Sequence, residues 1–180
     1  MKLAHQLKFI VLFWLILVSI GCISNKKMIN NSTVEKLEID KFTGTWYEIA
    51  RYDHRFEQEL VGVTATYSKL ENGKLQVLNK GHKNSLDNAE KNIIGKAKIP
   101  DLNKPGNLKV SFFWFFYADY LVMELDDLNY QWAVIGSSSP NYLWILNRTP
   151  FMDDKLYSDI LEKIKNRGYD TDKLILVPQK

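Results

Sequence analysis

The chain has 180 residues, of which 46% are hydrophobic and 13% aromatic, and its formal net charge is +3. This length corresponds to one domain with a sizeable core, and the composition excludes a disordered protein. The charge is too small and too dispersed for a nucleic-acid-binding protein, so we expect no nucleic-acid partner.

Residues 1–21 have the pattern of an export signal. Lys2 and Lys8 form a basic start, and an unbroken apolar run follows over residues 9–18. A membrane-spanning helix needs about 20 apolar residues, so this run is too short to be a good anchor by itself.

Cys22 directly follows this leader and is the only cysteine, so the rest of the chain forms no internal disulfide. A lone cysteine can be a small buried hydrophobic residue, but here the context resembles the processing site of bacterial lipoproteins, whose cysteine is acylated. Ser19 stands where leucine is commonest in such sites, which leaves processing by ordinary signal peptidase as the alternative. Residues 22–36 are polar and predict a flexible tether between this anchor and a folded domain over 37–180.

The folded domain shows regularly spaced strand patterns, which predict an all-β fold: an eight-stranded up-and-down antiparallel barrel. Helical spacing over 153–167 predicts one α-helix packed outside the barrel, and 174–177 predicts a short final strand. The eight barrel strands are expected near 44–51, 62–70, 74–83, 91–99, 108–115, 120–126, 130–137 and 142–148.

Alternation along the strands predicts which side chains point into the barrel. A barrel of eight strands is either filled by its own side chains or wide enough for one small ligand, and both alternatives fit the pattern. Small inward residues favour a cavity. The expected inward residues are Val63, Ala65, Tyr67, Leu75, Val77, Asn79, Ile93, Gly95, Ala97, Ile99, Leu108, Val110, Phe112, Trp114, Leu121, Met123 and Leu125.

Two sequence motifs resemble the signatures of the lipocalin family. Gly44-Thr45-Trp46 opens the first expected strand, and Arg148 ends the last. In that family the arginine lies across the tryptophan and seals the closed end of the barrel, so the resemblance implies Trp46 beneath Arg148. Further stretches (44–56, 64–68, 77–81, 109–113 and 142–150) resemble the bacterial outer-membrane lipoprotein subgroup of lipocalins, which is similar to apolipoprotein D.

The resemblance implies an outer-membrane lipoprotein on the periplasmic face, attached through acylated Cys22. It implies non-covalent binding of a long-chain fatty acid or lysophospholipid in the barrel, with no cofactor. Tyr67, Asn79 and Lys83 are expected to orient the ligand headgroup near the mouth. The full expected set of ligand contacts is Ala65, Tyr67, Val77, Asn79, Lys83, Phe112, Trp114, Leu121 and Met123.

Catalysis and metal binding have little support in the sequence. The three histidines, His5, His54 and His82, lack metal-ligand spacing, and no serine elbow is present. His54 belongs to a charged triplet that predicts a solvated or salt-bridged loop. We therefore expect a binding protein; the alternatives are an enzyme that acts on a bound lipid, and an adhesion or assembly module with a filled barrel.

Four consecutive aromatic residues, 114–117, fall at the turn after the fifth expected strand. If Trp46 marks the closed end, this turn lies at the open end of the barrel. The rings either pack beneath neighbouring loops or form a rim that touches lipid headgroups, where such rings prefer to sit.

Overall fold

The computed structural model describes residues 28–113 and 116–180. The expected signal peptide, Cys22 and Trp114 lie outside the described residues.

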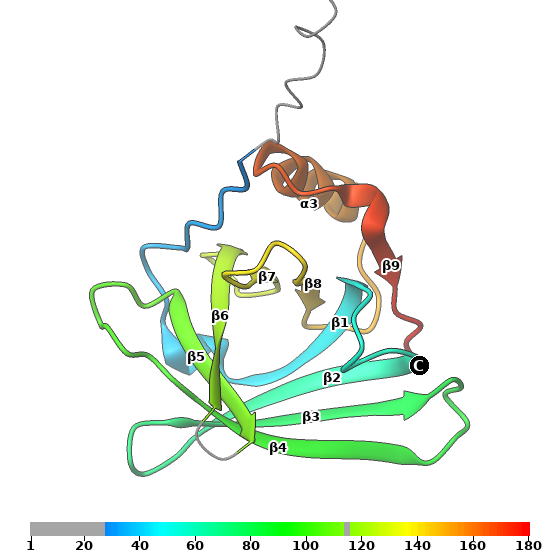
Figure 1. Cartoon of the computed structure of the whole chain (residues 1–180), viewed down its shortest axis with the longest axis horizontal. Helices are drawn as coiled ribbons and strands as arrows, with labels where there is room; N and C mark the ends of the chain where they lie inside the picture. The colour runs from blue at the N-terminus through cyan, green and yellow to red at the C-terminus, as the bar shows by residue number, and fades with distance from the viewer. Residues whose placement is uncertain (1–27, 114–115) are drawn as a thin grey trace, which may run out of the picture.

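The strands form one closed antiparallel barrel, as the sequence predicts (Figure 1). Neighbours along the chain pair with one another, and β1 pairs with both β8 and β2, which closes the circle. A short additional strand, β9, pairs with the end of β1. The strands are β1 (Gly44–Tyr52), β2 (Leu60–Lys69), β3 (Leu75–Lys83), β4 (Glu90–Lys98), β5 (Asn107–Phe113), β6 (Phe116–Leu125), β7 (Trp132–Gly136), β8 (Leu143–Asn147) and β9 (Leu174–Leu176).

Two ends of the barrel can be distinguished by what covers them. The four-residue helix α2 (Ile39–Phe42) precedes β1 and covers the closed end, together with the β2–β3, β4–β5 and β6–β7 connections. The other connections, β1–β2, β3–β4, β5–β6 and β7–β8, lie at the opposite end, which we call the mouth.

The helix α3 (Asp154–Asn166) lies outside the barrel, above β7 and β8 in Figure 1. Asp153 caps its first turn by accepting a hydrogen bond from the Leu156 backbone N–H at 3.1 Å. Gly168, with φ +94°, follows the helix in the left-handed conformation that favours glycine. The predicted helix over 153–167 is thus confirmed.

Two separate hydrophobic clusters stabilise this arrangement. One fills the barrel interior toward the closed end, around Phe42, Trp46 and Tyr67. The other lies between the outer barrel wall and α3, where Ile160 and Ile164 are fully buried. Several strands are therefore apolar on both faces.

The expected orientation of Leu121 and Met123 is wrong. Both side chains belong to the cluster under α3, whereas Val122 belongs to the interior cluster and Tyr120 packs against it. Because α3 covers this part of β6, the strand is apolar on both faces, and alternation alone cannot choose the inner one.

Residues 28–36 lie along the barrel wall, although the sequence assigns them to a flexible tether. The Asn30 backbone N–H donates to the Arg167 carbonyl, and that of Val34 donates to the Val122 carbonyl at 2.9 Å. Figure 1 shows this segment (blue) running from α3 down to α2. We call residues 28–36 the strap. Its polar composition conceals these contacts, because most of them use the backbone.

Candidate functional site

The closed end is sealed by a tryptophan under an arginine, as the family resemblance implies. The Arg148 guanidinium carbon lies 3.7 Å from the ring centroid of Trp46, which is fully buried. The Trp46 indole N–H donates to the Phe42 carbonyl at 2.8 Å. Arg148 donates to the backbone carbonyls of Lys41 at 2.6 Å and Thr45 at 3.0 Å, and so ties α2 to β1.

Gly44 is needed at this seal for two reasons. Its φ is +93°, a backbone conformation that residues with a Cβ rarely adopt. A Cβ at this position would also lie 3.2 Å from Nη1 of Arg148. Gly44, Trp46 and Arg148 therefore form one closed-end unit.

A pair of tyrosines lies among apolar walls toward the closed end. Tyr67 pairs with Gly44 and its ring packs against Phe42, so its expected place near the mouth is wrong. The Tyr67 hydroxyl donates to the Tyr120 hydroxyl oxygen at 2.7 Å. Burial raises the pKa of both phenols above the usual value, so both remain protonated. Val77 and Ala65 belong to the same interior region, which confirms the expected orientation of β2 and β3.

Several inward side chains are only partly buried, although they belong to the interior. Ala65, Tyr120 and Trp144 pack against the interior cluster and yet keep part of their surface exposed, as do Val110 and Phe112. The interior cluster is therefore accessible to solvent at these side chains.

Asn79 lies at the same level as Ala65, its Cα partner on β2, which in turn pairs with Trp46. Its expected place near the mouth is therefore wrong. Its side-chain oxygen is buried and has no hydrogen-bond partner among the described residues. A buried amide oxygen without a partner carries a desolvation penalty, so this oxygen is available to a donor that enters the barrel.

A buried ion pair lies nearer the mouth, and the sequence alone did not predict it. Arg51 Nη1 donates to Glu48 Oε1 at 2.7 Å, and both side chains are almost fully buried. Positions 48 and 51 would face opposite sides of a regular strand. A β-bulge between Glu48 and Ala50 shifts the alternation, so both side chains point inward.

The loop between β1 and β2 (residues 53–59) folds down onto this ion pair. Arg51 Nη2 donates to the carbonyls of Glu57 at 2.7 Å and Leu60 at 3.1 Å. The Trp144 indole N–H donates to Glu57 Oε2 at 2.9 Å. Arg51 and Glu57 therefore fix the loop in the mouth.

His54 is part of this cluster: of the two alternatives for its loop, solvated or salt-bridged, the structure shows the salt-bridged one. Its side chain is only 9% exposed and packs against Tyr142 and Trp144. Nε2 lies 3.2 Å from the Glu57 carboxylate without a well-aligned hydrogen bond, and Nδ1 has no partner among the described residues. The flanking charged residues in the sequence conceal this burial.

Two carboxylates share one arginine here, and their pKa values move in opposite directions. Burial, and then the nearby charge of Glu57, raise the pKa of Glu48 well above its ordinary value, against the opposing effect of Arg51. Burial also opposes ionisation of Glu57, but His54 and the Trp144 N–H hold its pKa below the ordinary value. Glu57 therefore carries the negative charge more readily than Glu48.

The remaining expected ligand contacts are less central. Phe112 packs against the interior cluster, and its ring crosses close to Gly95. Lys83 lies at the mouth, where its exposed amine pairs with Glu59 at 3.2 Å.

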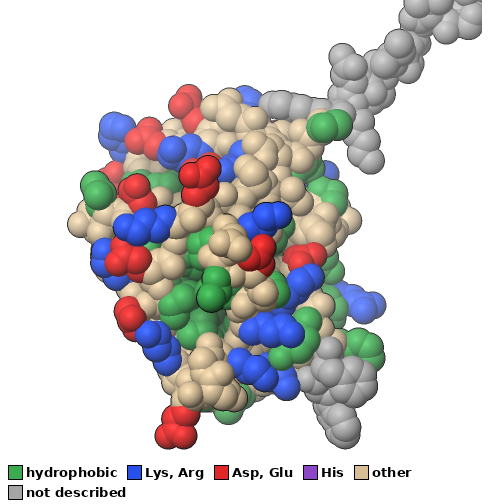
Figure 2. All heavy atoms as spheres, turned by 90° about the vertical axis from the view of Figure 1, so that its left-hand side faces the viewer, with side chains coloured by type: hydrophobic (Ala, Val, Ile, Leu, Met, Phe, Trp, Pro, Cys, Tyr) green, Lys and Arg blue, Asp and Glu red, His purple; other side chains and the backbone are tan. Residues whose placement is uncertain are grey.

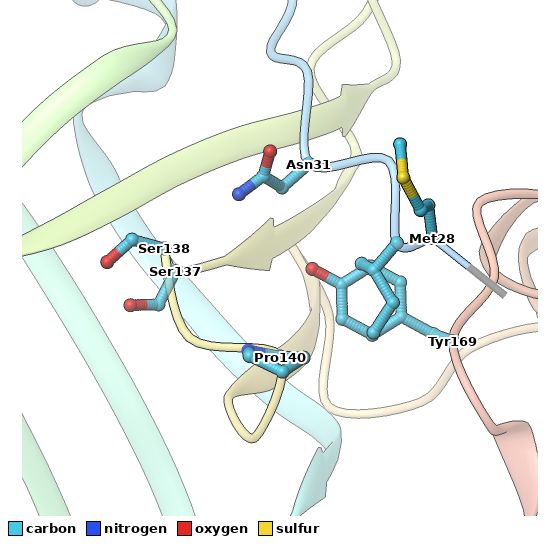
Figure 3. A pocket seen from close by; sticks show the side chains of 7 residues that line it. Met28, Asn31, Ser137, Ser138, Pro140 and Tyr169 are labelled. Carbon is cyan, nitrogen blue, oxygen red and sulfur yellow. The ribbon is translucent and has the colours of Figure 1, made fainter. Parts of the chain in front are cut away.

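Two pockets lie on the outside of the barrel, along the strap. One, of about 230 Å³, is lined by Met28 and Tyr169 on one side and by Ser138 and Pro140 of the β7–β8 loop on the other (Figure 3). Ile29 also lines it. The second, of about 770 Å³, is lined by strap residues and by residues of β5, β6 and the loop before β5.

Within residues 28–113 and 116–180, no three His, Cys, Asp or Glu side chains are grouped as metal ligands. The same residues contain no helix that is long and apolar enough to cross a membrane.

The barrel, the closed-end pair and the external helix define the class of protein. A family model described as a lipocalin-like domain matches residues 37–179, and the chain belongs to the lipocalin family. This membership confirms the resemblance carried by Gly44, Trp46 and Arg148.

Among characterised relatives, the chain is similar to the outer membrane lipoprotein Blc of Vibrio cholerae. The two are 40% identical over 170 residues, which cover 92% of this chain and 97% of the relative. Outer membrane lipoprotein Blc of Escherichia coli K12 is 41% identical over 148 residues, 82% of each chain. Bovine apolipoprotein D is 28% identical over 151 residues, which cover 81% of this chain and 78% of that protein.

Solved structures show the same fold. Insecticyanin from the tobacco hornworm Manduca sexta superimposes with a TM-score of 0.67 at 20% identity, covering 83% of this chain and 84% of that one. Apocrustacyanin C2 gives a TM-score of 0.64 at 18% identity, covering 79% and 80%.

Proposed function

We propose that this lipocalin is an outer-membrane lipoprotein that binds a single-chain lipid, a long-chain fatty acid or a lysophospholipid, inside its barrel. The observation that carries the proposal is the partly exposed apolar lining of the barrel interior, formed by Ala65, which pairs with Trp46, and by Val110 and Phe112. An acyl chain there would gain roughly 25 cal/mol for each Å² of apolar surface removed from water.

The polar groups of the interior are suited to the head of such a lipid. Asn79 offers a hydrogen-bond acceptor without a partner, and the Tyr120 hydroxyl accepts from Tyr67 while its own proton remains available. A few such groups among apolar walls orient a ligand and leave the apolar surface to supply the affinity. Similarity to Blc, an outer membrane lipoprotein, supports a location in which single-chain lipids are at hand.

Filling the cavity should eject the ligand and leave the barrel folded. In Ala65→Trp, the indole enters the space that the acyl chain needs. We expect the affinity for a fluorescent fatty acid to fall by about tenfold or more, with a stability loss of about 1 kcal/mol or less. Fluorescence titration and thermal unfolding measure the two effects.

Thr66→Trp is the matched control, because Thr66 lies on the outer face, where its hydroxyl bonds that of Thr45. Its ligand affinity should be nearly unchanged. An Ala65→Trp variant that loses about 1–3 kcal/mol of stability and whose folded fraction binds normally would show that the interior is a filled core.

We further propose that acyl chains on Cys22 attach the protein to the periplasmic face of the outer membrane. The leader pattern and the name of the Vibrio cholerae relative, an outer membrane lipoprotein, support this location. Stable attachment takes more than one acyl chain, because a single chain binds membranes only reversibly.

Cys22→Ser should move the protein from the membrane fraction to the soluble fraction and abolish labelling with a radioactive fatty acid. Arg55→Ser, an exposed substitution in the β1–β2 loop, serves as the control and should remain membrane-bound and labelled. Identical fractionation of parent and Cys22→Ser would refute the acylation proposal.

A further inference from the structure

Apolar side chains are exposed at the mouth, where β5 turns into β6. Phe113 is 62% exposed and Phe116 is 73% exposed, and their Cα atoms are paired across the two strands. Ile94, on the outer face of the neighbouring strand β4, is 59% exposed. Folding normally covers side chains of this size, so a group of three is a candidate contact surface.

These side chains belong to one surface because β4 and β5 are in close contact beside them. A Cβ at Gly95 would lie 2.6 Å from the Phe112 ring and 2.7 Å from the Ser111 carbonyl oxygen. Ile94 and Phe113 flank this contact directly in the sequence. Only glycine fits at position 95, so β4 and β5 approach each other closely there. This close approach keeps Ile94 and Phe113 next to each other.

Basic side chains accompany the apolar ones. Lys96 and Lys98 alternate with Ile94 on the outer face of β4, and among the described residues neither forms an ion pair with a carboxylate. The Lys98 amine instead lies 4.5 Å from the ring centroid of Tyr117. Figure 2 shows basic and hydrophobic side chains side by side on the lower part of the face it displays.

The strap brings the chain in beside the β7–β8 loop, on the side of the mouth away from the junction of β5 and β6 (Figure 1). Met28 lines a pocket together with Ser138 and Pro140 of the β7–β8 loop, which belongs to the mouth, as the β5–β6 turn does. Cys22 is six residues before Met28, and six extended residues reach about 20 Å. An anchor at Cys22 would therefore hold the β7–β8 side of the mouth close to the membrane.

We propose that Ile94, Phe113, Phe116, Lys96 and Lys98, here called the rim patch, dock the mouth onto an anionic phospholipid bilayer. Aromatic rings enter the headgroup region, and lysines at the bilayer surface attract anionic lipids. The docked barrel opens toward the membrane, so a lipid can pass between bilayer and interior with little exposure to water. Docking itself does not depend on what the barrel binds.

Vesicle binding of the mature chain tests this surface without the anchor. The chain starting at residue 22 with Cys22→Ser is mixed with sucrose-loaded vesicles of phosphatidylglycerol and phosphatidylethanolamine and then sedimented. Phe113→Ser with Phe116→Ser should weaken binding by about tenfold or more. Lys96→Gln with Lys98→Gln should weaken binding to these vesicles and remove its salt dependence, with little change on phosphatidylcholine vesicles.

The control removes equally exposed apolar side chains at the closed end. Leu102 is 83% exposed and Phe151 is 72% exposed, so Leu102→Ser with Phe151→Ser should keep the parental vesicle binding. Unchanged binding of the Phe113/Phe116 variant, or an equal loss in this control, would overturn the rim patch. So would a parental dimer that only this variant converts to a monomer, because the patch would then join two copies.

Fatty-acid titration of every variant separates this proposal from the proposed function. Rim-patch variants should bind a fluorescent fatty acid in solution with parental affinity, because none of the substituted side chains lies in the interior cluster. Loss of vesicle binding with intact titration supports docking alone. A parent that binds vesicles but no fatty acid would refute the proposed ligand and leave docking standing.

Discussion

Trp46→Ala should cost about 3–5 kcal/mol of unfolding free energy, one of the two largest effects expected of any single substitution here. Trp46 is fully buried, its ring packs on Phe42 at a centroid distance of 5.1 Å, and its indole N–H is bonded to the Phe42 carbonyl. Truncation leaves a cavity beneath Arg148 and an unpaired carbonyl. Urea unfolding followed by circular dichroism measures the loss.

A double-mutant cycle shows whether the seal acts as a unit. Arg148→Ala removes the stacking on Trp46 and the hydrogen bonds that tie α2 to β1. The combined variant should lose less stability than the sum of the two single losses, because both remove the same contact. Additive losses would mean that the guanidinium stabilises only the backbone and gains nothing from the ring.

Arg51→Met should destabilise the fold by about 3–5 kcal/mol, because it leaves Glu48 and Glu57 buried without their shared cation. It also releases the β1–β2 loop, whose carbonyls at Glu57 and Leu60 accept from Arg51. Adding Glu48→Gln removes one of the two carboxylates and should recover part of the loss. No recovery in Arg51→Met with Glu48→Gln would contradict the electrostatic explanation.

The raised pKa of Glu48 gives this cluster a defined pH dependence. A carboxyl whose folded pKa lies above its unfolded value, ordinarily 4.5, stabilises the fold fully below that value. That contribution is lost as the pH rises through the folded pKa. The Glu48→Gln side chain does not titrate. The melting temperature of this variant should therefore rise relative to that of the parent as the pH increases above 4.5. Parallel profiles would mean that Glu48 is ionised throughout.

Features set by local chemistry were predictable from the sequence. Alternating side chains and turn residues identified all eight barrel strands and the helix, and their bounds agree with the structure within a few residues. The closed end was also predictable, because Gly44 and Trp46 at one end of the domain and Arg148 at the other form a recognisable pair. Each depends on residues whose roles do not change with the surrounding fold.

Features set by tertiary context were not predictable. Leu121 and Met123 point toward α3 because the helix makes the outer face of β6 as apolar as the inner one. The Glu48–Arg51 pair depends on a bulge in β1, which a one-residue change in pairing produces without a marked sequence signal. The strap is held on the barrel wall by backbone hydrogen bonds. Its polar side chains do not indicate these bonds, so its position was not predictable.

Native mass spectrometry of the protein purified from cell envelopes tests the central claim most directly. The account predicts one single-chain fatty acid or lysophospholipid bound to each parental chain, at a mass set by its acyl length. It also predicts that Ala65→Trp, purified in the same way, carries none, whereas Thr66→Trp retains it. A parental chain that carries no lipid, or an Ala65→Trp chain that carries the same lipid at the same occupancy, would contradict a ligand site inside the barrel.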